Sequence, residues 1–553
     1  QPDTVQKNVK ALEDALKDMN AGRLPDAGDP DQPRQDAKDD PTNTAPGEMD
    51  ITPNLLDDIG DQLLTYIDRE KGGLRGAPKF PNPSLLDFLW RNYARRGENA
   101  FKTAITHTLT NMGNGGIYDH IGGGFARYSV DENWHVPHFE KMLYDNALLI
   151  DLMGEVWRDT QDPFFERRVR ETCDWALREM RVEEKGKGRL FAFGSSLDAD
   201  SLNPGGNPEE GAFYTWTEKE IRDSLDEDQA KLFIESFGIS KAGNWPQGSE
   251  DRGEGLNIPY RLQEEDSGEL SDLEEQLQAA CKALFQKRED RPRPFYDDKV
   301  LCDWNGMMIA ALARVSRIFN ATDLLEAAET AFGFIEKYLS KDRKGHLYHS
   351  YRAARAAHQG LADDYVFMID ASLALYEVTG KPDYFEKARI WADILEQDYL
   401  DEADGGYFQS GPDAGDVIIR PKIINDTAVP SSNGQMLVNF ARLAAHDPGG
   451  PWIKRGDALI KAFSGQLQHN LYGLFTFLNG VTAFREGRHV VIEGDRDDET
   501  AQNLRSAMRQ KSLPGAVWLD KFEGRPGATV CSGGTCHDKL TGVGDLIQAL
   551  REK

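Results

Sequence analysis

This sequence has few cysteines, no long apolar run and no excess of basic residues. Five cysteines among 553 residues are too few for a fold held together by disulfides. No apolar stretch approaches the roughly 18 residues that a membrane-spanning helix needs. We therefore expect a soluble chain, and we exclude the small cystine-rich and the membrane-spanning classes.

Basic residues are outnumbered by acidic ones, 65 to 93, which gives a formal charge of −28. Such a chain repels a phosphate backbone unless it carries a local basic face. The longest basic patches, Arg167–Arg170 and Arg352–Arg355, are short and fall in helix or turn contexts, where a solvated surface is expected. We exclude nucleic acid as a partner.

The residues that are present suffice for a large core. An apolar fraction of 39% excludes wholesale disorder, and the length exceeds one ordinary domain. Residues 1–50 differ, because a helical stretch at Val5–Met19 is followed by a Pro-, Asp- and Gly-rich segment that we interpret as a disordered linker.

The sequence starts at Gln1. Signal removal, proteolysis and truncation all fit this start, so a cytoplasmic and an exported protein both stay open.

Amphipathic helical spacing recurs across the segment 51–485. Short glycine-aromatic strings, such as GGLRGAPKF at Gly72 and GGYFQS at Gly405, separate the helical stretches and favour turns and short strands. A helix pair cannot bury its own apolar faces, so repeated pairs predict a closed ring, an (α/α)6 barrel of six hairpins; an open solenoid is the rival. The predicted helices cover 55–69, 84–95, 100–112, 139–159, 163–181, 271–286, 304–319, 323–340, 364–378, 382–399, 433–445 and 452–470.

The pattern changes after Arg485. The strings HVVIEGD and GAVWLDK indicate buried strands, and helical spacing covers 499–510 and 545–551. We predict a small α/β domain over 486–553. In it, Cys531 and Cys536 have a spacing that suits a disulfide-closed turn or a redox pair equally well.

Polar strings precede four of the predicted inner helices. These are WHVPHFEKMLYDN, DDKVLCDWNGMM, LADDYVFMID and INDTAVPSSNGQM. Inner helices of such a ring run roughly parallel, so these strings should converge on one pocket, where free N–H groups suit oxygen-rich ligands. Simple helix capping is the alternative for Asp303, Asp363, Ser431 and Ser432.

The densest group of reactive side chains follows Tyr118. It offers a cation, two imidazoles, carboxylates and phenols, which together can perform acid/base catalysis. We assign catalytic roles to Glu140, His138, His135 and Asp364, and substrate-binding roles to Arg127, Tyr128, Tyr144, Asp145, Asp200, Trp216, Asp298, Trp304, Asn305, Tyr365 and Asn433. Structural roles are the alternative for each histidine. A metal held by His135, His138 and Glu140 has a spacing that matches no strong signature, so we expect neither metal nor cofactor.

The run GGIYDHIGGGFARYSVDENWHVPHFEKMLYDNALL resembles the thioredoxin-domain-containing proteins related to spermatogenesis-associated protein 20. GAPKFPNP, GAFYTWT, RPRPFYDDKVLCDWNGMMIAALA, LADDYVFMID and ATVCSGGTCHDKLT match the same family. The resemblance implies a thioredoxin-like N-terminal domain followed by a six-hairpin barrel similar to N-acylglucosamine 2-epimerases. Thioredoxin-like strands and a C-x-x-C motif do not precede the barrel here, so we expect the chain to begin just past that domain.

Paired carboxylates favour glycoside hydrolysis, and a histidine-centred pocket favours epimerisation or isomerisation. We therefore expect a carbohydrate-active barrel with a sugar-like ligand. The alternatives are a noncatalytic sugar-binding or docking module serving a thioredoxin-like domain or protein, and a redox accessory acting through Cys531 and Cys536. Oligomeric state is left open.

Overall fold

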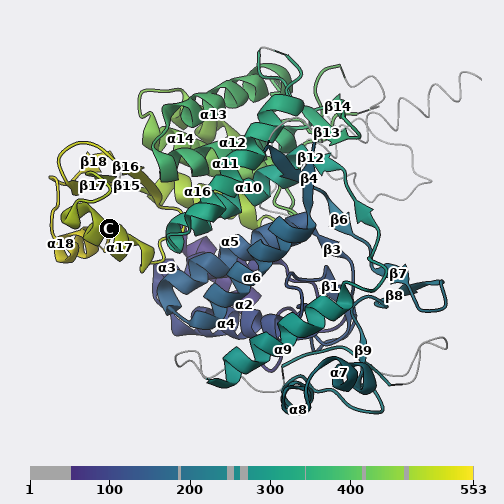
Figure 1. Ribbon diagram of the computed structural model, residues 1–553. Helices are drawn as coiled ribbons and strands as arrows, with labels where there is room; N and C mark the ends of the chain where they lie inside the picture. Colours follow the sequence, from purple (N-terminus) through teal and green to yellow (C-terminus); the bar gives the residue numbers. More distant parts are fainter. Residues whose placement is uncertain are drawn as a thin grey trace, which may run out of the picture.

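A computed structural model describes residues 51–184, 189–245, 255–261, 272–342, 344–413, 419–465, 472–532 and 534–551. The predicted helix at Val5–Met19 and the linker after it lie outside these ranges. Helices dominate the described chain (Figure 1). Within it, none of the helices has the length and apolar character needed to cross a membrane.

Six of the described helices form an inner ring. Each packs against the next, and the last returns to the first, which closes the barrel. The ring consists of α3 (Pro83–Arg96), α5 (Leu143–Thr160), α10 (Cys302–Ile318), α12 (Ala362–Thr379), α14 (Ser432–His446) and α16 (Phe475–Glu486). The predicted (α/α)6 fold is confirmed.

An outer layer of described helices packs against this ring. Its members are α2 (Pro53–Leu64), α4 (Asn99–Asn114), α6 (Pro163–Glu179), α11 (Thr322–Tyr338), α13 (Pro382–Ile394, continued by a π-helical turn Leu395–Tyr399) and α15 (Trp452–Phe463). Burial explains the two layers. The inner helix α12 is buried without interruption from Ala362 to Leu375, whereas α13 buries one face only.

Short strands gather at the end of the barrel where the inner helices begin (Figure 1). They pair mostly as local hairpins, for example β13 with β14, where Tyr348 lies opposite Gln359. Their bounds are β1 Tyr128–Ser129, β2 Pro137–His138, β3 Lys141–Met142, β4 Arg181–Glu183, β5 Phe191–Phe193, β6 Ser196–Leu197, β7 Asp200–Leu202, β8 Pro208–Glu210, β9 Trp216–Thr217, β10 Leu256–Asn257, β11 Tyr296–Asp297, β12 Val300–Leu301, β13 Tyr348–Arg352 and β14 Arg355–Gln359.

The expected membership of the ring was wrong in two places. The helix predicted at 271–286 is α9 (Asp272–Arg288), which packs with α7 (Glu218–Ser224) and α8 (Glu227–Ser236) in a separate core outside the ring. The sixth inner helix is instead α16, for which we predicted no helix. It begins inside YGLFTF, one of the glycine-aromatic strings that we expected to form turns and short strands. Its alternating aromatic residues imitate a strand pattern, but burial within the barrel overrides that preference.

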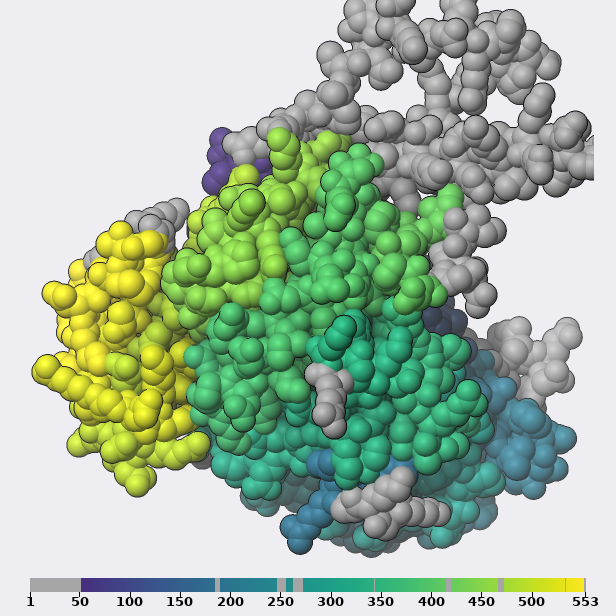
Figure 2. All heavy atoms as spheres, turned by 90° about the horizontal axis from the view of Figure 1, so that it is seen from above, coloured from purple at the N-terminus to yellow at the C-terminus, as the bar shows by residue number. Residues whose placement is uncertain are grey.

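The C-terminal unit is a four-stranded sheet with two helices, seen as a separate yellow lobe beside the barrel (Figure 2). The strand order is β16-β15-β17-β18, with β15 and β16 parallel across α17. The elements are β15 Arg488–Glu493, α17 Glu499–Arg509, β16 Val517–Lys521, β17 Gly527–Ser532, β18 Thr535–Cys536 and α18 Val543–Ala549.

This unit is fixed to the end of the barrel where the inner helices finish. Glu155 of α5 accepts hydrogen bonds from the Ser512 hydroxyl at 2.7 Å and the Leu513 N–H at 3.0 Å. Trp90 of α3 donates to the same hydroxyl at 3.0 Å. The C-terminal unit therefore packs on the end of the barrel opposite the strands.

Candidate active site at the mouth of the barrel

Buried asparagines attach the loops of the mouth to the inner helices. Asn305 of α10 accepts from Phe193 N–H at 2.8 Å and donates to the carbonyls of Phe193 and Leu301. Asn433 of α14 likewise accepts the Tyr407 N–H at 2.8 Å and donates to the carbonyls of Tyr407 and Ile423. Each asparagine thus uses both amide hydrogens to hold a glycine-aromatic string. We had assigned both residues to substrate binding, and the structure gives them this loop-holding contact instead.

The mouth contains a cavity of about 270 Å³ between the starts of α3, α5 and α16 and the loop before α14. Its polar wall includes Asn82, Ser84, Arg127, Tyr144, Asp145, Asp426 and Thr427, and its apolar wall includes Phe80 and Phe475. A few convergent polar groups on an otherwise apolar wall are typical of a small-molecule site.

Arg127 lines this cavity and forms an ion pair with Glu140. The Arg127 Nη1 lies 3.1 Å from a Glu140 oxygen, and the same oxygen lies 3.8 Å from His138 Nε2. His138 Nδ1 lies 2.9 Å from Glu210, and its ring stacks on Tyr128 with centroids 4.9 Å apart. The structure thus brings together four of the residues that we predicted from the dense group.

The expected helix geometry around Glu140 was wrong. We predicted that α5 begins at Phe139, so that Glu140 and Tyr144 share a helix face. Instead α5 begins at Leu143, and Lys141–Met142 form strand β3. Pairing of β3 with Ser196–Leu197 holds this segment extended, so Glu140 precedes the helix.

Asp145 is the most deeply buried carboxyl of the cavity. It is 5% exposed, and its Oδ2 has no hydrogen-bond partner among the described residues. Burial raises the pKa of Asp145 well above its ordinary value, and the nearby Arg127 opposes this only in part. Asp145 therefore favours its protonated form more strongly than an exposed carboxyl does.

Asp426 lies in the same cavity with a different environment. Its two oxygens accept the Ser431 N–H at 2.9 Å and the Thr476 N–H at 2.8 Å. Burial raises its pKa, while these backbone hydrogen bonds act in the opposite direction. Bonds to the ionised form make Asp426 the better base of the two carboxyls.

Trp304 connects this cavity to the starts of α10 and α12. Its ring lies edge-on to Tyr144 with centroids 4.8 Å apart. The preceding residue, Asp303, donates its backbone N–H to an Asp364 oxygen at 3.0 Å. Contacts therefore link the start of α5 to the starts of α10 and α12. The mouth cavity itself is lined from two of the four polar strings, those before α5 and α14.

Asp364 holds a histidine that the sequence analysis missed. His349 Nδ1 lies 3.1 Å from both Asp364 oxygens, and its Nε2 makes no hydrogen bond to any described residue. Burial alone would lower the pKa of His349, but the charge of Asp364 raises it to about 9. His349 lies on β13, outside the four polar strings that we expected to converge.

Asp303, His349 and Asp364 lie close enough to hold a metal ion, since one ligand atom from each falls within 4.8 Å of the others. Asp364, however, already accepts the N–H groups of Asp303 and Leu361 in addition to the imidazole. This saturation suits a carboxylate that orients a histidine better than a metal ligand. Burial, followed by the charge of Asp364, raises the pKa of Asp303 well above its ordinary value.

The remaining predicted site residues lie away from the mouth cavity or are enclosed. His135 packs on Tyr260 at 4.5 Å, Asp200 is exposed on β7, and Asp298 pairs with the exposed Arg352 at 2.5 Å. Trp216 lies in the separate core of α7, α8 and α9. Tyr365 is fully buried, and its hydroxyl accepts the Leu347 N–H at 3.0 Å, which is a loop-holding contact.

Cys531 and Cys536 form a disulfide across the hairpin of β17 and β18. The other three cysteines are free, with Cys173 and Cys302 buried and Cys281 partly buried. The pair lies in the C-terminal unit, apart from the mouth residues. It contributes no group to the cavity.

No family model matches the chain. Some solved structures have a similar course of chain at low identity. A D-mannose isomerase is 11% identical with a TM-score of 0.46, over 74% of this chain and 85% of that one. A cellobiose 2-epimerase from Bacillus thermoamylovorans is 11% identical with a TM-score of 0.45, over 74% and 86%. These values assign no reaction to the present chain, so its chemistry is argued from its own residues.

Curated sequences are much more similar. Human spermatogenesis-associated protein 20 is 30% identical over 491 residues, which cover 83% of this chain and 62% of the human one. The rat protein is 32% identical, over 83% of this chain and 61% of its own. An uncharacterized Caenorhabditis elegans protein is 30% identical, over 85% and 67%. The chain spans about three fifths of the length of the mammalian relatives, and it belongs to the family of spermatogenesis-associated protein 20.

Proposed function

We propose that the mouth of the barrel is a carbohydrate-active site that performs acid/base catalysis of the glycoside hydrolase type. In this proposal Asp145 is the general acid and Asp426 is the base. The observation that carries it is that both carboxyls line one cavity in contrasting environments. Two carboxyls with different proton affinities are the minimum that glycosidic bond cleavage requires.

The difference between the two carboxyls gives each its role. Asp145 has an unpartnered oxygen and a pKa raised far by burial, so it would donate a proton to the leaving oxygen. Asp426 accepts two backbone N–H groups, which favour its ionised form, so it would activate water or attack the sugar. Proton transfer of this kind contributes about 10²–10⁴-fold to rate.

Other residues at the mouth would bind the ligand. Trp304 and Tyr144 offer aromatic surface and a hydroxyl to a sugar ring, and Arg127 faces the cavity. Glu140 and His138 lie behind Arg127 and would hold it in place for the ligand. His135 is outside this proposal, because its ring packs on Tyr260.

A specific observation favours sugar epimerisation or isomerisation as a second candidate. The pair of His349 and Asp364 resembles the carboxylate-oriented histidines that move protons in many enzymes. With a pKa of about 9, His349 would be protonated at neutral pH and would polarise a sugar carbonyl oxygen rather than abstract a proton. Asp364 would then act through His349 and not on the substrate.

The noncatalytic alternative is a sugar-binding or docking module that serves a thioredoxin-like domain or protein. One experiment separates the three. The protein is screened against mono- and disaccharides by thermal shift, since a ligand raises the melting temperature by mass action. Each hit is then incubated with the protein in ¹⁸O-labelled water and in D₂O. A hydrolase puts ¹⁸O into the product, an epimerase exchanges carbon-bound hydrogen for deuterium, and a binding module does neither.

The hydrolase proposal predicts ¹⁸O at the new reducing end with no deuterium on carbon. Deuterium on carbon without ¹⁸O in the product would contradict hydrolysis and indicate epimerisation instead. A hit that binds and is recovered unchanged from both solvents would contradict catalysis.

A further inference from the structure

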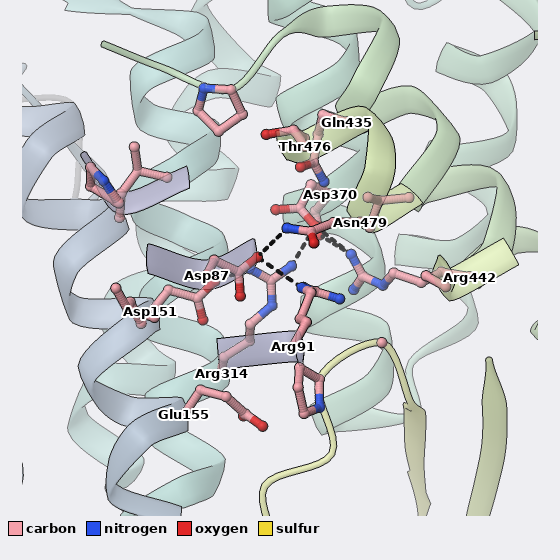
Figure 3. Close-up of a pocket in the computed structure, with 18 of the residues that line it drawn as sticks. Asp87, Arg91, Asp151, Glu155, Arg314, Asp370, Gln435, Arg442, Thr476 and Asn479 are labelled. Atoms are coloured by element: carbon pink, nitrogen blue, oxygen red, sulfur yellow. Dashed lines mark hydrogen bonds and ion pairs between the residues drawn. The ribbon is translucent and has the colours of Figure 1, made fainter. Parts of the chain in front are cut away.

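A second cavity, of about 210 Å³, lies on the axis of the barrel (Figure 3). Every inner helix contributes a polar residue to its wall: Asp87 from α3, Asp151 from α5, Arg314 from α10, Asp370 from α12, Arg442 from α14 and Asn479 from α16. We call this cavity the lumen. None of these six residues lines the mouth cavity.

Ion pairs cross the lumen wall from helix to helix. Arg314 contacts Asp151 at 2.6 Å and also Asp370, and Arg442 contacts Asp370 and, at 2.9 Å, Glu377. Taking ions out of water costs several kcal/mol for each ion even in real proteins, so apolar packing would hold the helices together at a lower cost in free energy. A cavity lined with such pairs is therefore better explained by binding than by stability.

The arginines retain unused donors. Arg442 is 8% exposed, and its Nη2 has no partner among the described residues. Arg91 donates from Nε to Asp87 at 2.8 Å, and its terminal nitrogens make no hydrogen bond within the described chain. In Figure 3 the guanidinium groups of Arg91, Arg314 and Arg442 point toward the middle of the lumen. The wall thus offers hydrogen-bond donors that the protein leaves unsatisfied.

The mixture of charges identifies the ligand class. The five carboxyl side chains of the wall repel an anion and its five arginines repel a cation, whereas a neutral polyol can donate to the first set and accept from the second. The carboxyl groups are Asp87, Asp151, Glu155, Asp370 and Glu377, and the arginines are Arg91, Arg158, Arg314, Arg317 and Arg442. A water molecule occupies about 30 Å³ of liquid, so the volume of about 210 Å³ corresponds to about seven waters. That is the size of one monosaccharide.

The lumen adjoins the mouth. Pro83 and Ser84 line both cavities, and the lumen also reaches Pro430 and Thr476, next to the mouth residues Ala428 and Phe475. We propose that the lumen is a monosaccharide-sized subsite continuing the mouth, so that the substrate is a saccharide of two or more units with one unit inside the barrel. This rests on the proposed function of the mouth.

Gln435→Leu provides the test. Gln435 lines the lumen, and its amide makes a single 3.3 Å bond to Asn439, so its loss leaves the ion pairs intact. Gln62→Leu, on the exposed face of α2, is the matched control. Calorimetry measures the binding of glucose, mannose, N-acetylglucosamine and their 1,4-linked disaccharides, with inorganic phosphate as the anionic probe, to wild type, both variants and Asp145→Asn.

We expect one disaccharide to bind at least about tenfold more tightly than its monosaccharide, which corresponds to about 1.4 kcal/mol. Gln435→Leu should remove most of this advantage, and Gln62→Leu should keep it. Equal affinities for the two sizes, an unchanged advantage in Gln435→Leu, no binding by any sugar of the panel, or phosphate binding lost in Gln435→Leu would each overturn the lumen subsite.

Asp145→Asn separates the subsite from the chemistry of the mouth. If this variant keeps the disaccharide advantage while wild type yields no product, the lumen proposal stands and the catalytic one fails. If wild type hydrolyses a disaccharide but binds it no more tightly than the monosaccharide, the catalytic proposal stands and the subsite fails.

Discussion

The Nδ1 atom of His349 lies 3.1 Å from both carboxylate oxygens of Asp364, at a place where strand β13 meets the first turn of α12. The carboxylate fixes the ring and leaves Nε2 without a partner within the described chain. Because Asp364 also accepts two backbone N–H groups, the pair is anchored to the barrel itself. His349 therefore binds its proton more tightly in the folded protein than in the unfolded chain.

This pair makes stability depend on pH. The folded pKa of His349, about 9, exceeds its ordinary value of 6.5, so its stabilising effect is complete below 6.5 and is lost as the pH rises through 9. Urea unfolding of wild type and His349→Asn should give a difference in unfolding free energy that shrinks across this window. His358→Asn, on the neighbouring strand β14 and exposed, is the control. A difference that is constant with pH would contradict the ion pair.

Asp145 should show the behaviour of a carboxyl whose pKa the fold raises. Its folded pKa is raised above the ordinary 3.8, so wild type loses stability as the pH rises above that value. Asp145→Asn carries no ionisable group there. We expect this variant to match wild type near pH 4 and to be more stable at pH 7, as measured by thermal unfolding. A variant that is less stable than wild type at pH 7 would mean that Asp145 is ionised and paired.

The loop-holding role of Asn433 predicts a loss of stability rather than of binding. Asn433→Ala removes three buried hydrogen bonds and leaves their backbone partners unsatisfied, which should cost at least about 2 kcal/mol of unfolding free energy. Asn425→Ala, at an exposed position of the preceding loop, should change it by no more than about 0.5 kcal/mol. If urea unfolding gives equal midpoints for the two variants, the side chain does not hold the loop.

The cysteines should divide into two classes by reactivity. After mild reduction of the folded protein, iodoacetamide should modify Cys531 and Cys536, since Cys536 is exposed on its hairpin. Cys173 and Cys302 should stay unmodified until the chain unfolds, because burial raises the pKa of both thiols. Mass spectrometry of the alkylated peptides measures this. Equal labelling of all four in the folded state would contradict the described burial.

The barrel could be predicted from sequence because its helices alternate with glycine-aromatic returns along the whole chain. The predicted starts of α6 and α15, at Pro163 and Trp452, agree with the structure. Membership of the ring was harder. Periodicity gives the same signal for α9, which packs outside the ring, as for a barrel helix, and the aromatic residues of α16 imitate a strand.

The site was predicted in outline, with errors that have a physical origin. A string of polar residues before a helix can hold a loop, cap the helix or face a ligand, and sequence does not separate these. Asn305 illustrates the first case, Asp364 the second and Asp145 the third. His349 was not predicted because its contact with Asp364 joins a strand to the start of a helix. No local sequence pattern reports a contact between two such elements.

The most direct measurement is the turnover of the best saccharide hit by wild type, Asp145→Asn and the control Asp383→Asn on the exposed surface of α13. The asparagine keeps the shape of Asp145 but cannot give up a proton as an acid. We predict that Asp145→Asn lowers kcat at least about 100-fold while the Kd for the saccharide stays within about threefold, and that Asp383→Asn changes neither. An Asp145→Asn variant with the kcat of wild type would contradict an acid/base site at the mouth of the barrel.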